Sequence, residues 1–192
     1  AEELDRVVPV IRALAGHGFP CLSLGGALAD LQPGAQTVGV LRPPAYEVTG
    51  RDGRTLSEHW ADGMRTLHGI HVHGFPNLLF VQPTQGANLI SNVPHNIVDS
   101  ARTVALVVRH AADGGFGTVE PSADAEAAWV ELLLTGPRSM IGGPDCTPGY
   151  YNNEGQDPGQ FLGYGYPYGP SAYFTYIDKW RASGTFDGLE FR

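Results

Sequence analysis

The chain has 192 residues, a formal net charge of −8 at pH 7 and two cysteines, Cys21 and Cys146. The acidic balance argues against nucleic acid or an anionic membrane as the main partner, and no apolar run is long enough to suggest a membrane span. Two cysteines give neither a disulfide framework nor a zinc knuckle, so we expect a reduced, cytoplasmic protein. Because the chain starts at Ala1 and has no methionine before Met64, we also expect a processed protein or a piece of a longer one.

The first 45 residues carry the weakest structural signals. Apolar positions in residues 2–15 recur at helical spacing, and residues 38–41 could form a short strand. A glycine pair at the end of residues 22–26 invites comparison with a phosphate-binding loop, but the G-x-G-x-x-G spacing and a βαβ frame are missing. We therefore leave this segment unassigned.

The next stretch predicts a strand, a turn and a short helix. Residues 46–54 alternate in polarity and reach the dipeptide Asp52–Gly53, which is typical of a tight turn. Thr55 or Ser57 can then cap a helix that continues to Met64.

The strongest pattern follows directly. Residues 78–81 form a short apolar run between turn signals, which predicts a buried strand. A long helix is predicted over residues 94–112, capped by Asn92 or Ser91, with Pro94 in its first turn. Its apolar residues recur at helical spacing as one stripe: Val93, Ile97, Ala101, Val104, Val108 and Ala111. This strand and helix predict the centre of a mixed α/β fold.

Glycines and caps divide the C-terminal half into further elements. The glycine-rich run 113–117 ends the long helix, and the next helix begins at Ser122 with an acidic first turn and ends at Gly136. A final amphipathic helix is predicted over residues 171–182. Residues 185–192 predict a short strand or an extended tail.

Residues 142–170 combine many glycines and prolines with six aromatic side chains. A disordered linker rarely carries so many aromatic residues, so we expect a long ordered loop over the body of the protein. Tyr150 and Tyr151 within it either cover an active site or pack as ordinary tyrosines. Cys146 has no surrounding His–Asp pattern, so we interpret it as a small hydrophobic residue rather than a nucleophile.

Three histidines, His68, His71 and His73, fall within six residues and could together ligate zinc. No cysteine or paired carboxylate lies at the usual spacing from them. We therefore expect no metal. The favoured role is structural: the histidines hydrogen-bond loop carbonyls and support entry into the central strand.

A tight polar loop joins the central strand to the long helix and consists of Gln85, Gly86, Ala87, Asn88 and Leu89. A strand, a tight loop and a helix start can aim free backbone N–H groups at an anion or at the electron-rich edge of a ring. The alternative is a plain strand-to-helix turn, in which Gly86 serves only the backbone geometry. The residues alone leave both interpretations open.

Several ordered blocks resemble one known family. LSEHWADGMRTLHGIHVHGFPN, FPNLLF, QGANLISNVPHNIV, CTPGYYNNEG and AYFTYIDKWRASGTFDGLEFR are similar to the C-terminal part of the Baeyer–Villiger monooxygenases, class B flavoproteins that use FAD and NADPH. The resemblance covers residues 49–192, whereas residues 1–45 do not match. It implies the C-terminal fragment of a flavoprotein with two dinucleotide-binding domains. Residues 46–113 would complete the FAD-binding domain, and residues 114–192 would form a helical and loop extension.

The resemblance also implies a site and a reaction. Residues 85–89 would lie against the flavin, and Tyr150 and Tyr151 would lie near NADPH and the ketone substrate. The reaction would use O2 and NADPH to convert the ketone to an ester or lactone. Both G-x-G-x-x-G fingerprints are absent from the chain, so we expect it to be inactive alone and to need the missing N-terminal part of the enzyme as its partner. No arginine falls in a matching motif, so the catalytic residues stay unknown. The alternatives are a non-catalytic folded remnant and a small binding module.

Overall fold

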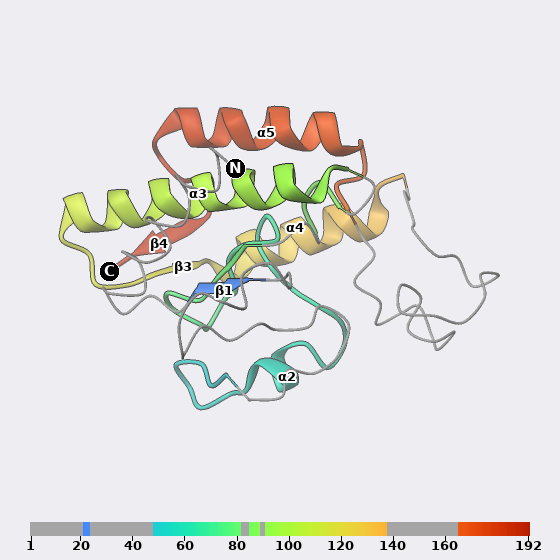
Figure 1. The fold of residues 1–192 in the computed structure, drawn as a ribbon. Helices are drawn as coiled ribbons and strands as arrows, with labels where there is room; N and C mark the ends of the chain where they lie inside the picture. Colours follow the sequence, from blue (N-terminus) through green and yellow to red (C-terminus); the bar gives the residue numbers. More distant parts are fainter. Residues whose placement is uncertain (1–20, 24–47, 82–84, 89–90, 138–164) are drawn as a thin grey trace.

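A computed structural model describes residues 21–23, 48–81, 85–88, 91–137 and 165–192. Within these ranges the elements are β1 (Cys21–Ser23), α2 (Leu56–His59), β2 (Leu79–Val81), α3 (Val93–Gly114), β3 (Val119–Pro121), α4 (Ala123–Thr135), α5 (Pro170–Ser183) and β4 (Leu189–Phe191). Figure 1 shows their arrangement. The mixture of helices and strands confirms the predicted α/β class.

Several predictions of the sequence lie outside the described residues. These are the helix over residues 2–15, the strand over residues 38–41, Leu89, Cys146, and most of the loop over residues 142–170 with Tyr150 and Tyr151.

Strand β2 is the buried strand that the apolar run predicted, and it begins one residue later than expected. All three of its residues are buried. It pairs in parallel with β1, so that Cys21 lies opposite Leu79 and Ser23 lies opposite Val81. His71 also forms an antiparallel bridge with Leu79. The pairing with β1 was not predicted, because three residues without periodicity give no strand signal.

Helix α3 is the long helix of the prediction, extended by one residue at its start and two at its end. Asn92 caps it, since its side-chain oxygen accepts a hydrogen bond from the N–H of His95 at 3.0 Å. Gly115 ends it in the left-handed conformation, with φ of 71°. Its buried stripe packs on β2 in one cluster of Ile70, Leu79, Val81, Ala101, Val104 and Val108.

Helix α2 ends at His59, so the predicted continuation to Met64 is wrong. Thr55 caps it as expected, in a capping box with Glu58. The chain leaves the helical path at the C-cap Trp60, which has φ of −102° and ψ of 14°.

Of residues 46–54, which predict a strand that enters a turn at Asp52–Gly53, the structure describes residues 48–54, and these form no strand. The structure has a turn at residues 51–53 and a single antiparallel bridge between Thr49 and Thr55. The turn at Asp52–Gly53 is confirmed, and the described residues beside it are joined by this one bridge.

Strands β3 and β4 form a small antiparallel sheet in which Val119 lies opposite Phe191 and Pro121 opposite Leu189. The C-terminal strand was predicted and β3 was not, because a three-residue stretch with Glu120 and Pro121 shows no alternation. Helix α4 follows at once with the predicted cap, as the Ser122 hydroxyl accepts a hydrogen bond from the N–H of Ala125 at 3.2 Å.

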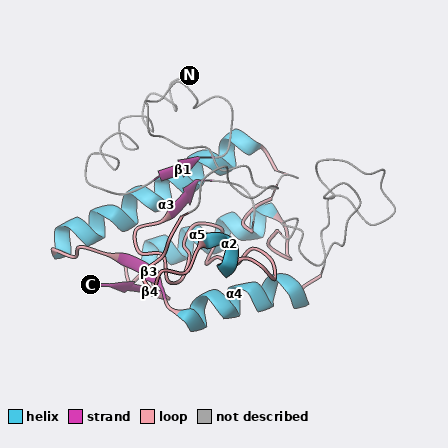
Figure 2. Ribbon diagram, turned by 90° about the horizontal axis from the view of Figure 1, so that it is seen from below, coloured by secondary structure: helices cyan, strands magenta, loops and turns pink. Residues whose placement is uncertain are grey.

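Helices α3 and α5 run side by side (Figures 1 and 2). One arginine joins them: Arg181 of α5 donates to the Asp99 carboxylate at 2.7 Å and to the Thr103 hydroxyl at 3.0 Å. Both acceptors belong to α3. No helix of the described residues is both long and apolar enough to span a membrane.

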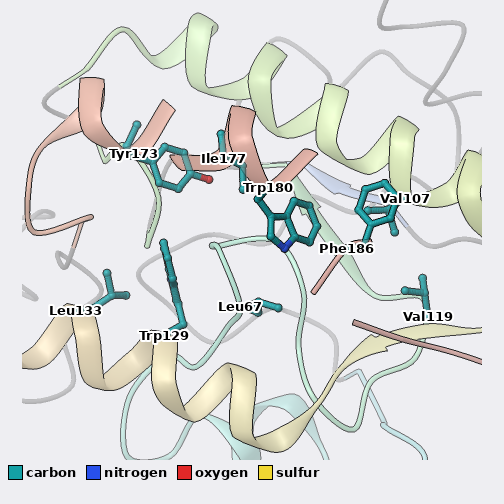
Figure 3. Close-up of a cluster of buried hydrophobic side chains, with 10 residues drawn as sticks. Leu67, Val107, Val119, Trp129, Leu133, Tyr173, Ile177, Trp180 and Phe186 are labelled. Atoms are coloured by element: carbon teal, nitrogen blue, oxygen red, sulfur yellow. The ribbon is translucent and has the colours of Figure 1, made fainter. Parts of the chain in front are cut away.

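The main core lies between α3, α4 and α5 (Figure 3). Its buried residues are Leu67, Ala87, Val107, Val119, Trp129, Leu133, Tyr173, Ile177, Trp180 and Phe186. Ala87 belongs both to this core and to the polar loop, so the loop is packed directly against the C-terminal helices.

Candidate functional site

The loop between β2 and α3 is described at residues 85–88, and all four residues are buried. Gln85 and Asn88 have positive φ values of 55° and 65°. Such a conformation is uncommon for a residue with a side chain and costs about 1–2 kcal/mol. The surrounding structure must therefore hold this loop in shape.

The Gln85 side chain is one anchor of the loop. Its amide oxygen accepts a hydrogen bond from the Thr66 hydroxyl at 2.5 Å, and its amide nitrogen donates to the Met64 carbonyl at 2.7 Å. Because both partners belong to the segment before β2, this buried side chain fixes the loop to that segment. Asn96 of α3 adds a second anchor by donating to the Asn88 carbonyl at 3.0 Å.

The loop carbonyls contact the C-terminal helices. The indole N–H of Trp129 donates to the Gln85 carbonyl at 3.0 Å, and the backbone N–H of Tyr166 donates to the Gly86 carbonyl at 2.8 Å. Within the described part of the chain, no group accepts a hydrogen bond from the N–H of Gly86 or of Ala87.

Gly86 lies in a tight place. A Cβ atom added there would lie 3.0 Å from the ring carbon Cζ and the hydroxyl oxygen of Tyr173. The Tyr173 hydroxyl donates to the His68 carbonyl at 3.0 Å, so this ring cannot move away freely. Gly86 does not have a positive φ, so close packing against Tyr173, and not the turn geometry, favours glycine at this position.

Two of the three clustered histidines are fully buried among aromatic rings. The His68 ring lies in edge contact with Trp129 and Trp180, each at a centroid distance of 4.8 Å, and its Nε2 lies 3.0 Å from the Tyr176 hydroxyl. Burial, and then the neighbouring His71, lower the pKa of His68 well below its usual value. Burial lowers the pKa of His71 to about 3.

Among the described residues, the nearest match to the predicted bonds from histidines to loop carbonyls is at His73, whose Nδ1 lies 2.9 Å from the carbonyl of Pro121 in β3. For His68 and His71 the prediction is wrong, because an aromatic core surrounds their rings; His71 supports β2 through its backbone instead. Among the residues that the structure describes, no group of three or more His, Cys, Asp or Glu side chains is placed to hold a metal ion.

Two buried carboxylates connect the histidine segment to β3 and α4. Glu120 accepts hydrogen bonds from the Arg51 guanidinium at 2.5 Å and from the Gly74 N–H at 3.0 Å. Glu126 accepts from the His73 N–H at 2.8 Å and lies 3.2 Å from Nε2 of His59. These contacts hold the segment before β2 in place and thereby also support the partners of Gln85.

Residues that shape the loop were missed by sequence reasoning. Trp129 and Tyr173 lie on the helices that the sequence predicts between Ser122 and Gly136 and over residues 171–182, but no role at the loop was predicted for them or for Thr66. No local signal could have found them, because Trp129 bonds a carbonyl 44 residues away and Tyr173 bonds one 105 residues away. The structure places the predicted residues Gln85, Gly86, Ala87 and Asn88 together.

Comparisons with known proteins find relatives over about three quarters of the chain, although no protein-family model matches. The FAD-binding monooxygenase hmp7 of Hypomyces subiculosus is 38% identical over 154 residues, which are 79% of this chain and 25% of that protein. Baeyer–Villiger monooxygenase 4 of Dietzia sp. strain D5 is 38% identical over 148 residues, which are 76% of this chain and 24% of that protein.

Solved structures show the same relationship. The structure of an oxidised steroid monooxygenase bound to NADP matches with a TM-score of 0.61 and 25% identity, over 76% of this chain and 26% of that one. The chain thus spans about a quarter of the length of the proteins that it matches.

Proposed function

Because this chain corresponds to the C-terminal part of the Baeyer–Villiger monooxygenases, we propose that it forms the flavin-facing end of an FAD- and NADPH-dependent enzyme. The substrates of the whole enzyme are a ketone and O2, and its product is an ester or lactone. The partner of this chain is the N-terminal part that carries the dinucleotide-binding fingerprints. The observation that carries the proposal is the loop of residues 85–88 within the matched region.

The loop fits the pyrimidine edge of a flavin ring. It is buried, and in the described part of the chain the N–H groups of Gly86 and Ala87 have no recorded acceptor. The polar edge of a flavin ring carries hydrogen-bond acceptors, which suits donation from these two N–H groups. The residues that we propose to hold the flavin are Gln85, Gly86, Ala87, Asn88 and Leu89.

Bound FAD supplies the redox chemistry, and the protein orients the ring and adjusts its potential. The N–H groups of the loop favour negative charge on the ring edge that they face. The start of α3 lies directly after the loop, and its positive end acts in the same direction. Together these groups make a reduced, anionic ring more favourable.

Further assignments complete the proposal. Residues 46–113 form the last piece of the FAD-binding domain, and residues 114–192 form the extension that covers it. Tyr150 and Tyr151 lie near NADPH and the ketone, and the whole enzyme works in the reducing cytoplasm. These assignments rest on the family resemblance and on the low cysteine content.

One observation favours a second candidate. The chain spans about a quarter of its relatives and lacks both dinucleotide fingerprints, which suits a non-catalytic remnant or a small flavin-binding module. A binding module retains flavin without oxidising NADPH, whereas a remnant does neither.

Reconstitution tests the proposal. The chain is co-expressed with the part of the Dietzia relative that it does not match, and each piece is also purified alone. We expect the two pieces to purify together with flavin absorbance and to oxidise NADPH in the presence of a ketone, and neither piece to do so alone. Pieces that purify apart and without flavin would contradict the proposal.

A further inference from the structure

Two consecutive peptide groups of the loop are held through their carbonyl oxygens. The Gln85 carbonyl accepts from the Trp129 indole at 3.0 Å, and the Gly86 carbonyl accepts from the Tyr166 N–H at 2.8 Å. Both donors lie in the C-terminal extension, one on α4 and one just before α5. The loop itself belongs to the segment between β2 and α3.

Peptide planarity transmits these contacts to the N–H groups. No described peptide bond is cis, and in a trans peptide the C=O and the N–H of one unit point in opposite directions. The bond from Trp129 to Gln85 therefore sets the direction of the Gly86 N–H. In the same way, the bond from Tyr166 to Gly86 sets the direction of the Ala87 N–H. The Gly86 N–H therefore points away from the Trp129 indole, and the Ala87 N–H points away from the backbone N–H of Tyr166.

The two donors are themselves connected. The Trp129 and Tyr166 rings stack with a centroid distance of 5.6 Å and an interplanar angle of 21°. Trp129 is also in contact with Tyr173 and rises from α4 toward it (Figure 3). This aromatic stack fixes the indole, so its N–H is available in one position only. Without such donors, the positive φ of Gln85 would favour a different loop conformation.

We infer that Trp129 and Tyr166 are positioning residues that clamp the two peptide planes and thereby orient the N–H groups of Gly86 and Ala87. We call these two hydrogen bonds the clamp; they lie within this chain and do not depend on a bound flavin. That the oriented N–H groups serve a flavin rests on the proposed function. In this arrangement the C-terminal extension does more than cover the FAD-binding part, since it sets the direction of the donors that face the ring.

A matched pair of tryptophan variants tests the clamp. Trp129→Phe removes the indole N–H but keeps an aromatic ring. Trp180→Phe is the control, because Trp180 belongs to the same core and its indole donates to the Asp187 carbonyl at 2.9 Å, away from the loop. Residual dipolar couplings and order parameters of the Gly86 and Ala87 N–H groups are measured by NMR in the full chain without FAD.

We expect order parameters of about 0.85 at both positions in the wild type and in Trp180→Phe, and values below about 0.6 at Gly86 in Trp129→Phe, with its dipolar coupling averaged toward zero. If both variants keep rigid N–H groups, or if both lose them equally, the clamp is refuted. Should Trp129→Phe fail to fold, replacement of Trp129 by benzothienylalanine removes the N–H and keeps the ring shape. Since FAD is absent, a failure of flavin binding does not alter this result.

Discussion

At Gly86, the neighbouring side chains limit which residue the position can hold. An added Cβ would lie 3.0 Å from the Tyr173 ring, which is held by a hydrogen bond to the His68 carbonyl. We predict that Gly86→Val lowers the free energy of unfolding by about 1–3 kcal/mol through overpacking. It should also weaken FAD binding about tenfold or more by displacing the backbone. Urea denaturation of the chain measures the first effect, and FAD titration of the chain reconstituted with the unmatched part of the Dietzia relative measures the second.

His71→Phe serves as the comparison for that variant. The His71 ring is buried beside Trp180, and within the described residues neither ring nitrogen has a hydrogen-bond partner. An aromatic replacement should therefore keep the FAD affinity. If His71→Phe abolished binding while Gly86→Val left it unchanged, the site would lie at the histidine cluster and not at the loop.

The buried histidines also predict how stability depends on pH. Burial lowers the pKa of His68 well below its usual value and that of His71 to about 3. Above the unfolded pKa of about 6.5 neither state binds the proton. As the pH falls below that value, only the unfolded state binds it, so stability falls by up to about 1.4 kcal/mol per pH unit for each histidine. For His71 this loss continues down to pH of about 3.

Urea denaturation between pH 7 and pH 4.5 measures this slope. His71→Phe should reduce the slope, because it removes one group that only the unfolded state protonates. A slope that is equal in the wild type and in His71→Phe would show that His71 is protonated in the folded chain.

At the level of elements, α3 is the part that the sequence predicted best. Its cap, its glycine stop and its apolar stripe are local signals, and each is present in the structure. The same holds for the cap of α4 at Ser122. For α3 and α4 the predicted bounds therefore lie within two residues of the observed ones.

The short strands were less predictable, for a physical reason. Strand β1 forms because it pairs with β2, which lies more than 50 residues later in the chain, and β3 forms because it pairs with β4. Three residues carry too little periodicity to reveal such a partner. The loop of the candidate site was predicted from its neighbours, but the contacts that shape it come from Trp129, Tyr166 and Tyr173, which are distant in sequence.

The apolar face of α3 gives a test at this level. Ala101 is buried against β2, whereas Leu106 on the same helix is 41% exposed. Ala101→Asp should lower the free energy of unfolding by several kcal/mol, because it buries a charge without a partner. Leu106→Asp should change it by less than about 0.5 kcal/mol. Equal unfolding midpoints for the two variants would contradict the assigned face.

For the whole molecule, the missing fingerprints limit what the chain can do alone. The 192-residue protein lacks both G-x-G-x-x-G motifs, and it spans about a quarter of its relatives. We predict that the purified chain does not oxidise NADPH when a ketone and FAD are supplied. Loss of absorbance at 340 nm reports this oxidation. Ester formation by the pure chain would require a phosphate-binding site in the first 45 residues.

The most direct test of the account is the position at which flavin contacts this chain. The chain is labelled with nitrogen-15 and combined with the unlabelled part of the Dietzia relative that it does not match; FAD is then added stepwise, and the amide resonances of the labelled chain are followed by NMR. We predict that the largest shifts occur at the N–H groups of Gly86 and Ala87, because these are the groups that the loop presents to an acceptor. Shifts confined to the segment of His68 to His73, with Gly86 and Ala87 unchanged at saturating FAD, would contradict the account.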